Sequence, residues 1–422
     1  MKKRLDYKWI IAGLCFIMIF TCLGFCSSTR SLFVKPITEA LSMERSVYSF
    51  TDSFRFIAVA VVNMFFGVLV SKFGLRKLIA AGFISLTLSM TIYATANQFW
   101  HFYIAGTLLG IGFSWTTTTM VGCVVNRWCK EHKGTIMGAI LAANGLGGAL
   151  ATLLVTKIIH DPTDAFAYRK GYWMIAAVIA CVGIIVVLFF REKPKTTTPA
   201  PNSDQKPAKK RRGNSWVGIE YSRAVKMPHF YMAAICIMLT GAILQGITGA
   251  SAAHLEDVGI AKSYVGLVMS IHSVFLAVFK FATGVIYDKF GLRTTVNICS
   301  VTAVGVMLTL AFVTNTPTGR IMAMVYGVFA ALALPLETIM LPIYAGDLFG
   351  DKSFDRVLGV FVSVNSVGYA LGSVIINGCY DLFGSYKGVF IAAASVMVAL
   401  IIVLQYVISK SNGLRKMVTA NK

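Results

Sequence analysis

The sequence has few charged residues for its length. Only 14% of its 422 residues are charged, whereas soluble domains average about 25%. A soluble protein of this size could not cover its surface with so few charges, and the mean hydropathy of +0.71 agrees with this conclusion. The composition therefore excludes a soluble enzyme, a nucleic-acid-binding domain and a disordered protein.

Long apolar runs take the place of the missing charge. Each run is about 20 to 28 residues long, enough for a helix rising ~1.5 Å per residue to cross a hydrocarbon core of ~30 Å. Outer-membrane barrels are excluded because their strands alternate over only about 10 residues. The predicted fold class is an all-α membrane protein with twelve transmembrane helices in two six-helix bundles. The expected spans are 9–36, 46–71, 77–96, 101–126, 134–157, 171–190, 228–255, 263–287, 294–314, 319–345, 356–378 and 386–409.

Motifs of catalysis and cofactor binding are also missing. The nine cysteines lie mostly in apolar runs and have neither metal-ligand nor disulfide spacing. No glycine-rich phosphate loop, metal cluster or Ser/His/Asp grouping occurs in the sizeable polar stretches. We therefore expect no enzyme activity, no cofactor and no metal. Functional groups must be polar residues inside the spans, where a charge costs at least ~2.5–3.5 kcal/mol and is a functional hypothesis by default.

The charges that are present are mostly basic, 39 against 18, and give a net charge of +21. Most of the basic residues fall in alternate loops and at both termini, so the positive-inside rule predicts a multi-pass protein of the plasma (inner) membrane with cytoplasmic termini. That placement argues against a nucleic-acid partner. The proline-containing stretch 191–226, with the basic cluster 209–212, is predicted to be a disordered cytoplasmic linker between bundles at 1–190 and 227–422.

An internal repeat supports two similar halves. Gly67-Val-Leu-Val-Ser-Lys-Phe-Gly-Leu-Arg76 recurs 217 residues later as Gly284-Val-Ile-Tyr-Asp-Lys-Phe-Gly-Leu-Arg293. A second match pairs residues of spans 5 and 11, namely Gly138, Asn144 and Gly147 with Gly359, Asn365 and Gly368. Parallel repeats of this kind place a substrate site between the halves, near the membrane midplane.

The repeated stretch resembles the signature loop of the major facilitator superfamily. Its key positions are Gly67, Ser71, Gly74 and Arg76 in the first copy, and Gly284, Asp288, Gly291 and Arg293 in the second. The resemblance implies that both loops lock the inward-closed state through contacts between bases and acids across the halves. Ser71 stands where the family usually has Asp, so the first lock is expected to be the weaker one.

Further stretches resemble the oxalate:formate antiporter and monocarboxylate transporter branch of that superfamily. They are 125–134 with 144–148, Met227-Pro-His-Phe-Tyr231, and Asp381-Leu-Phe-Gly-Ser-Tyr386. The resemblance implies alternating-access transport of a small carboxylate without ATP. The expected partners are the carboxylate, a proton or counter-anion, and membrane lipid, and the expected functional unit is a monomer. An exporter of another metabolite or drug is the alternative.

Lys280 is the first candidate for a substrate anchor. It lies well inside span 8, four residues before Gly284. At that spacing the resembling carboxylate carriers hold a basic residue, usually Arg, that anchors the substrate. Lysine has a compact ammonium group, whereas arginine has a planar guanidinium that can bond both oxygens of a carboxylate. Lys280 would therefore hold a carboxylate with less defined geometry than arginine would. The alternative is a lysine that snorkels to the cytoplasmic face.

Three charged residues of spans 1 and 2 form the second candidate group. Arg55 lies near the middle of span 2, with Asp52 at i−3, and Arg30 lies at comparable outer depth in span 1. Arg55 is either a binding or gating residue or the partner of Asp52 in a neutralising pair. Arg30 is either a binding residue, a partner for Asp52 or an interface residue. With Lys280 these cations outnumber the embedded acids, which favours an anionic substrate.

Glu337 and His272 are the candidates for proton coupling. Glu337 follows Pro335 in span 10 and could carry a proton, act as a fixed counter-ion to Lys280, or pack near a kink. His272, in span 8, has an ordinary pKa near 6.5. The alternative to proton coupling is that His272 packs between helices and hydrogen-bonds there.

Asn144 and Asn365 are the symmetric amide pair. In the resembling branch, carriers of dicarboxylates such as oxalate have a second cation at the span 11 position where this chain has Asn365. The resemblance therefore implies a substrate with a single carboxylate. Asn365 could bond a hydroxyl or carbonyl of the substrate, or join helices. The run Trp115–Thr119 could line a cavity or bond its own helix carbonyls.

Overall fold

The computed structural model describes residues 7–43, 45–129, 131–159, 166–192, 218–383 and 385–420. Most of the predicted linker, including its basic cluster at 209–212, lies outside these ranges. The predicted disorder and cytoplasmic location of that segment therefore concern residues outside the described ranges.

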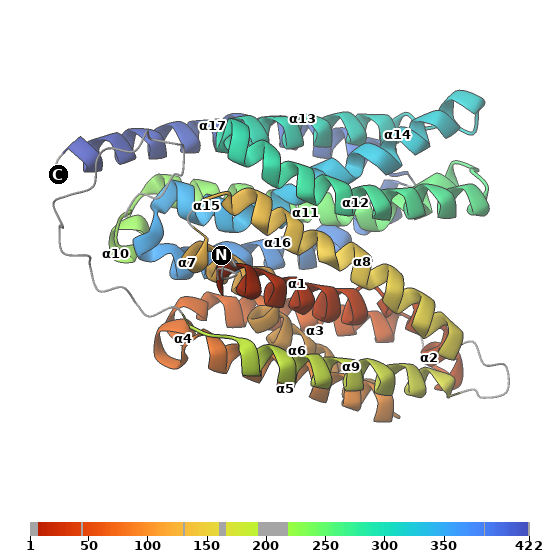
Figure 1. Cartoon of the computed structure of the whole chain (residues 1–422). Helices are drawn as coiled ribbons and strands as arrows, with labels where there is room; N and C mark the ends of the chain where they lie inside the picture. Colours follow the sequence, from red (N-terminus) through yellow and green to blue (C-terminus); the bar gives the residue numbers. More distant parts are fainter. Residues whose placement is uncertain are drawn as a thin grey trace, which may run out of the picture.

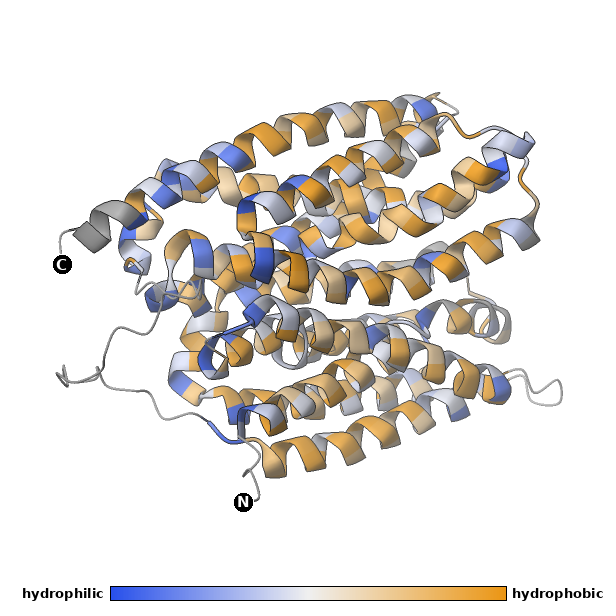
Figure 2. Ribbon diagram, turned by 45° about the horizontal axis from the view of Figure 1, so that its top comes forward, coloured by the Kyte–Doolittle hydropathy of each residue, from blue (hydrophilic) through white to orange (hydrophobic). Residues whose placement is uncertain are grey.

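The described chain contains eleven helices that are long and apolar enough to cross a membrane. A twelfth span is formed by two helices that meet at a 61° bend, Phe50–Met64 and Phe66–Phe73. Hydrophobic residues cover the middle of most helices, and hydrophilic residues gather toward their ends (Figure 2). The predicted fold class, an all-α membrane protein with twelve spans, is confirmed.

The helices fall into two groups along the chain. The first group is α1 (Tyr7–Cys26), α2 (Arg30–Ala40), α3 (Arg45–Met64), α4 (Phe66–Phe73), α5 (Leu75–Thr95), α6 (Phe99–Thr116), α7 (Thr118–Trp128), α8 (Lys133–Ile159) and α9 (Ala167–Phe189). After the short α10 (Tyr221–Ala224), the second is α11 (Pro228–Asp257), α12 (Lys262–Phe290), α13 (Leu292–Ala311), α14 (Pro317–Ala333), η1 (Leu334–Glu337), α15 (Met340–Phe349), η2 (Asp351–Ser353), α16 (Phe354–Phe383) and α17 (Lys387–Ala420).

Helices α8 and α12 run side by side between the two groups (Figure 1). The start of α1, the end of α17, α4 and α10 all lie toward one end of the molecule. We call this end the terminus side. The N-terminal half means α1–α9, and the C-terminal half means α11–α17.

Four of the expected spans are broken rather than continuous. The breaks follow Cys26 in span 1, lie at Phe65 in span 2 and at Thr117 in span 4, and fall in the 3₁₀ turn η1 in span 10. Pro335 in η1 lacks the amide that a continuous α-helix needs. Thr117 donates its hydroxyl to the carbonyl of Phe113 at 2.6 Å, which is one of the two roles considered for the threonine run. Breaks at membrane depth free backbone groups that other residues must satisfy.

Glycines bring the two halves into contact in two equivalent places. A β-carbon at Gly138 of α8 would lie 2.6 Å from the carbonyl oxygen of Lys280, and one at Gly359 of α16 would lie 2.3 Å from that of Asn63. Lys280 follows Asn63 by 217 residues, the interval that also separates Gly284 from Gly67. The sequence repeat is therefore a structural repeat, in which each half receives a glycine of the other against its backbone.

Candidate functional site

A cavity of about 320 Å³ lies between the halves and is lined by helices of both. We call it the central cavity. Five residues singled out from the sequence line it: Arg55, Asn144, Lys280, Glu337 and Asn365. Other polar residues of the lining are Ser27, Asn63, Ser114, Thr117, Thr118, Thr119, Gln245, Thr248, Thr338, Ser366 and Tyr369.

Lys280 is the buried cation of the C-terminal half. It is 6% exposed and makes no hydrogen bond or close ion pair with any residue in the described ranges. Glu337 is near enough to attract it electrostatically. Because the backbone of Lys280 packs against Gly138, the lysine stands at the contact between the halves. Its ammonium group is thus held in the cavity with its hydrogen-bonding capacity unused.

Glu337 lies at the end of η1, where the helix is broken. The break frees the Glu337 carbonyl, which accepts hydrogen bonds from Tyr369 Oη at 3.2 Å and from Asn365 Nδ2 at 3.5 Å. The carboxyl group is buried, and its Oε2 has no hydrogen-bond partner among the described residues. Two side chains of α16 therefore hold the backbone of Glu337 while part of its carboxyl group stays unpaired.

Tyr369 is a site residue that sequence reasoning missed. Its ring meets the ring of Phe56 edge-on, with centroids 5.7 Å apart. The guanidinium of Arg55 lies 4.5 Å from the centroid of the same Phe56 ring. A continuous series of contacts thus runs from Arg55 in the N-terminal half, through Phe56 and Tyr369, to Glu337 in the C-terminal half.

Arg30, Asp52 and Arg55 form one ion cluster. The Asp52 carboxylate pairs with Arg30, and it pairs with Arg55 at 2.7 Å. Arg55 also lines the central cavity, and its buried Nε has no hydrogen-bond partner among the described residues. Arg30 and Asp52 are not among the lining residues. The pairing matches the neutralising alternatives raised for Arg30 and Arg55, and only Arg55 combines it with a place in the cavity.

His272 lies outside the central cavity. Its Nδ1 is 3.1 Å from the carbonyl oxygen of Gly327, and its ring stacks on Tyr326 of α14. These are the contacts of a histidine engaged in helix packing. Asn144 lines the cavity and accepts a hydrogen bond from Ser28 at 3.3 Å, so it also joins α8 to the connection between α1 and α2.

The second motif copy joins the halves directly. The Asp288 carboxylate accepts hydrogen bonds from the amides of Gly134, at 3.1 Å, and Thr135, at 2.7 Å, in the first turn of α8. Anionic groups are favoured at a helix N-terminus. Gly284 sits directly on Gly134, since a β-carbon there would lie 2.1 Å from the Gly134 carbonyl oxygen. Gly291 makes the turn into α13 with φ +82°.

The first motif copy keeps the same backbone but has no carboxylate. Gly67 packs against Arg356 at the start of α16, and Gly74 turns with φ +78° into α5. The Ser71 hydroxyl donates locally to the carbonyl of Val68 at 2.8 Å. Ser71 therefore makes no hydrogen bond across the halves among the described residues.

The two motif arginines stay within their own halves. The amide of Arg76 donates to Glu192 Oε1 at 2.8 Å, and its Nε donates to the carbonyl of Val187. Arg293 Nε donates to Gln405 Oε1 at 2.8 Å. Both arginines thus tie their motif loop to the last helix region of the same half.

A different pair joins the halves beside the first motif copy. Asp355, in the first turn of α16, pairs with Arg127 at the end of α7 and accepts a hydrogen bond from the Cys123 thiol at 2.9 Å. The carboxylate that Ser71 lacks is thus present on the facing helix. Sequence reasoning missed this pair, and nothing in the motif pattern points to it.

These contacts all lie toward the terminus side of the central cavity. On α8, Gly134 precedes the cavity residues Leu141 and Asn144, and on α16, Asp355 precedes Asn365. The conformation is therefore closed between the central cavity and the terminus side.

Two repeated helical halves around a polar cavity, closed on one side by contacts between the halves, define a membrane carrier. The family model of the Major Facilitator Superfamily matches residues 14–253 and 233–418. The chain belongs to that superfamily, and it is a multi-pass membrane transporter rather than an enzyme.

The relatives in sequence are transporters of several kinds. An uncharacterized transporter of Bacillus subtilis, YcxA, is 24% identical over 70% of this chain and 68% of its own length. Monocarboxylate transporter 12-B of Danio rerio is 21% identical over 76% of this chain and 70% of its own. The multidrug resistance protein MdtG of Enterobacter lignolyticus is 22% identical over 94% and 90%.

Solved structures show the same fold. The transporter FucP in an outward conformation superposes with a TM-score of 0.72 at 14% identity, over 95% of this chain and 99% of FucP. The human organic anion transporter MFSD10 superposes with a TM-score of 0.70 at 13% identity, over 95% and 100%.

Proposed function

We propose that this transporter carries a small organic anion, a monocarboxylate, by secondary active alternating access. The observation that carries the proposal is Lys280, a cation without a hydrogen-bond or close ion-pair partner in the described structure, in a cavity shared by both halves. Burying a cation this way is costly unless an anion joins it. A substrate carboxylate is the natural partner.

The charge balance of the central cavity supports one negative charge on the substrate. Its charged lining residues are Arg55, Lys280 and Glu337. With all three ionised, the lining carries one net positive charge. Adding the paired Arg30 and Asp52 leaves that balance unchanged. In the empty cavity this excess attracts a monocarboxylate and repels a cationic drug.

Glu337 is the residue that we assign to coupling. In the empty cavity Lys280 and Glu337 attract each other. A bound carboxylate would take Lys280 for itself, and Glu337, buried without its cation, would then need a proton. The carrier would thus move an anion and a proton together. Movement of a counter-anion in exchange is the competing mode, and it needs no change at Glu337.

The orientation in the membrane follows from the basic residues. We propose that the terminus side faces the cytoplasm, because positive charge favours that side. Membrane-impermeant labelling of single cysteines placed in α10 and in the loop between α13 and α14 tests this orientation. Labelling of α10 from outside intact cells would reverse it.

Uptake into proteoliposomes tests the substrate class. The full chain is reconstituted and offered lactate, pyruvate, formate, oxalate and a cationic dye. Uptake of one or more monocarboxylates, with little oxalate and no dye, is the expected result. Uptake of the dye alone would make the protein an exporter of another class and would overturn the proposal.

A further inference from the structure

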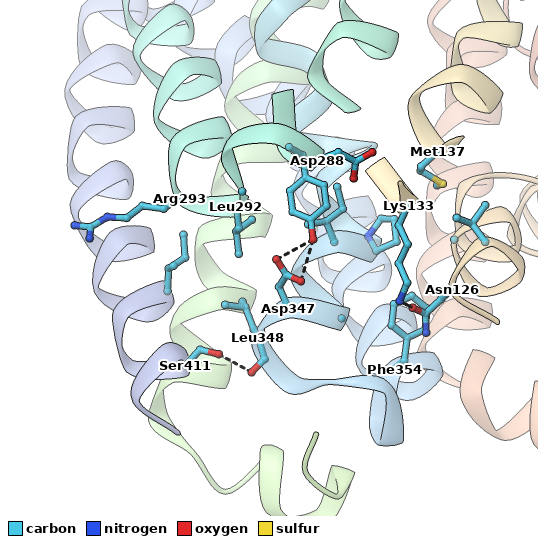
Figure 3. Close-up of a pocket in the computed structure, with 18 of the residues that line it drawn as sticks. Asn126, Lys133, Met137, Asp288, Leu292, Arg293, Asp347, Leu348, Phe354 and Ser411 are labelled. Carbon is cyan, nitrogen blue, oxygen red and sulfur yellow. Dashed lines mark hydrogen bonds between the residues drawn. The ribbon is translucent and has the colours of Figure 1, made fainter. Parts of the chain in front are cut away.

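A second cavity, of about 360 Å³, lies between the halves near the terminus side (Figure 3). We call it the terminus-side cavity. Its lining comes from α7, the start of α8, the end of α12, Gly291, the start of α13, α15, η2, the start of α16, and α17. It is separate from the central cavity and belongs to no function argued so far.

The two cavities lie in line along the same helices. On α8, Met137 lines the terminus-side cavity and Leu141, one turn further, lines the central cavity. On α15, Pro342 and Leu341 line the two cavities and are neighbours in the chain. The step from one lining to the other is therefore about one helical turn along α8, or roughly 6 Å, and a single residue along α15.

Glycine contacts close this layer. A β-carbon at Gly122 of α7 would lie 2.8 Å from Cβ of Pro342. Gly138 of α8 meets the backbone at Lys280 in the same way. Glycine has no side chain to fill a gap between helices. A small separation of α7 and α8 from α12 and α15 would therefore join the two cavities into one path.

The acids of the terminus-side cavity all have partners. Asp288 binds the first amides of α8, Asp347 accepts the Tyr287 hydroxyl at 3.0 Å, and Asp351 accepts from Asn126 at 3.1 Å. Figure 3 shows Asp347 within the lining, with the hydrogen bonds that it accepts drawn as dashed lines. Asp351 also lies 3.7 Å from the ammonium of Lys133.

The cations of the terminus-side cavity are less fully paired. Lys133 binds Asn126 at 2.5 Å and lies 3.7 Å from Asp351. Arg293 points outward, away from the cavity, toward Gln405 (Figure 3). Lys289 lines the cavity and has no hydrogen bond, ion pair or ring contact with any residue in the described ranges. Lys289 is exposed, and among the lysines and arginines of the lining it is the one without a protein partner in the described ranges.

We propose that the terminus-side cavity is the second anion site of the transport path, where Lys289 receives the substrate carboxylate after it leaves Lys280. This inference rests on the proposed function and adds the place and residue of release. The carboxylate crosses the thin layer between Leu141 and Met137 when the halves separate on the terminus side. The path thus passes the second motif copy, whose residues line the terminus-side cavity, and not the first.

The repeat supplies a matched control for this site. Lys72 is the counterpart of Lys289 in the first motif copy, 217 residues earlier. It lies 5.5 Å from the Phe73 ring and lines neither cavity. Lys72→Gln and Lys289→Gln therefore remove the same charge at equivalent positions on the same side, and only one of them removes it from the proposed site.

The test uses full-length protein in proteoliposomes of defined orientation. The probe is whichever of lactate, pyruvate and formate the wild type carries fastest, and half-saturating concentrations are measured separately from each side. Lys289→Gln should raise this value about two- to fivefold on the terminus side, as expected for one partly exposed charge. It should leave the opposite side unchanged. Lys289→Glu should raise it further, and Lys72→Gln should change neither side.

An unchanged terminus-side value in Lys289→Gln would overturn the second site. An equal rise on both sides, or an equal effect of Lys72→Gln, would also overturn it, because the effect would then be general to the fold or to surface charge. If the wild type carries none of these acids, the proposed function fails before any variant is compared, and this inference fails with it. If it carries one and Lys289 has no effect, only the second site is lost.

Discussion

Lys280 occupies in α12 the position that Asn63 occupies in α3. The carbonyl of each residue lies against a glycine of the facing half, Gly138 for Lys280 and Gly359 for Asn63, and both residues line the central cavity. The repeat reproduces the backbone, while at this position only the C-terminal half has a charged side chain. A symmetric scaffold thereby acquires one cation whose counter-ion can come from the substrate.

Glu337→Gln should separate transport from the proton. If Glu337 takes a proton when the substrate binds Lys280, the variant should still exchange labelled for unlabelled monocarboxylate across proteoliposomes. Accumulation driven by a pH gradient should fall to the background, because the amide cannot carry the proton. Gradient-driven uptake at the wild-type rate would exclude Glu337 from coupling.

Glu220→Gln is the control for that experiment. Glu220 precedes α10, outside the spans, and accepts a hydrogen bond from Lys352 at 2.7 Å. This bond holds the pKa of Glu220 below its ordinary value. The carboxyl therefore stays ionised across the neutral range and would be protonated only in more acidic solution. Its removal should leave the pH dependence of transport unchanged near neutrality.

Tyr369→Phe should weaken the positioning of Glu337. The variant keeps the ring that meets Phe56 and loses the hydrogen bond to the Glu337 carbonyl. One lost bond of this kind is worth about 0.5–1.5 kcal/mol. We expect a slower gradient-driven uptake with a shifted pH profile and little change in exchange at saturating substrate. Tyr231→Phe, at an exposed tyrosine of α11, should leave both unchanged. An unaltered pH profile in Tyr369→Phe would mean that the bond is only structural.

Asp288→Asn should open the terminus side. The carboxylate holds two amides of α8, and charge-assisted bonds are worth ~1.5–3 kcal/mol. The ratio of closed to open molecules should fall by roughly 10- to 100-fold. Spin labels at the exposed positions Lys72 and Lys410, one in each half, should report a longer distance in the variant.

Ser71→Ala is the matched control for Asp288→Asn, because Ser71 bonds only the Val68 carbonyl of its own helix among the described residues. The label distances should be those of the wild type. An equal response of the two variants would show that the second lock does not depend on the Asp288 charge.

The sequence predicted the twelve spans because hydropathy and length alone set them. It also singled out Lys280 and Glu337, because a charge inside an apolar run is rare enough to be noticed. The breaks in spans 1, 2 and 4 were missed, whereas Pro335 had already pointed to a kink near Glu337 in span 10. Counting along the repeat would also have matched Lys280 to Asn63.

Other parts of the site depend on contacts that no sequence pattern encodes. Tyr369 looks like any aromatic residue of an apolar helix, and its role exists only because the broken helix frees the Glu337 carbonyl. Arg127 and Asp355 lie far apart in the chain, and their pairing depends on how the two halves meet. The pairing of Arg30 and Arg55 with one carboxylate likewise required the tertiary structure to choose between the alternatives.

Monocarboxylate affinity of Lys280→Gln tests the central claim most directly. It is measured at matched expression, with Lys280→Arg alongside. Loss of the charge-assisted bond between Lys280 and the substrate carboxylate should cost ~2–4 kcal/mol, or roughly 30- to 1,000-fold in affinity, in a protein that still folds and inserts. Lys280→Arg should keep part of the affinity, because the charge survives while its geometry changes. Wild-type affinity in Lys280→Gln would contradict the account and leave Arg55 as the remaining cation of the cavity.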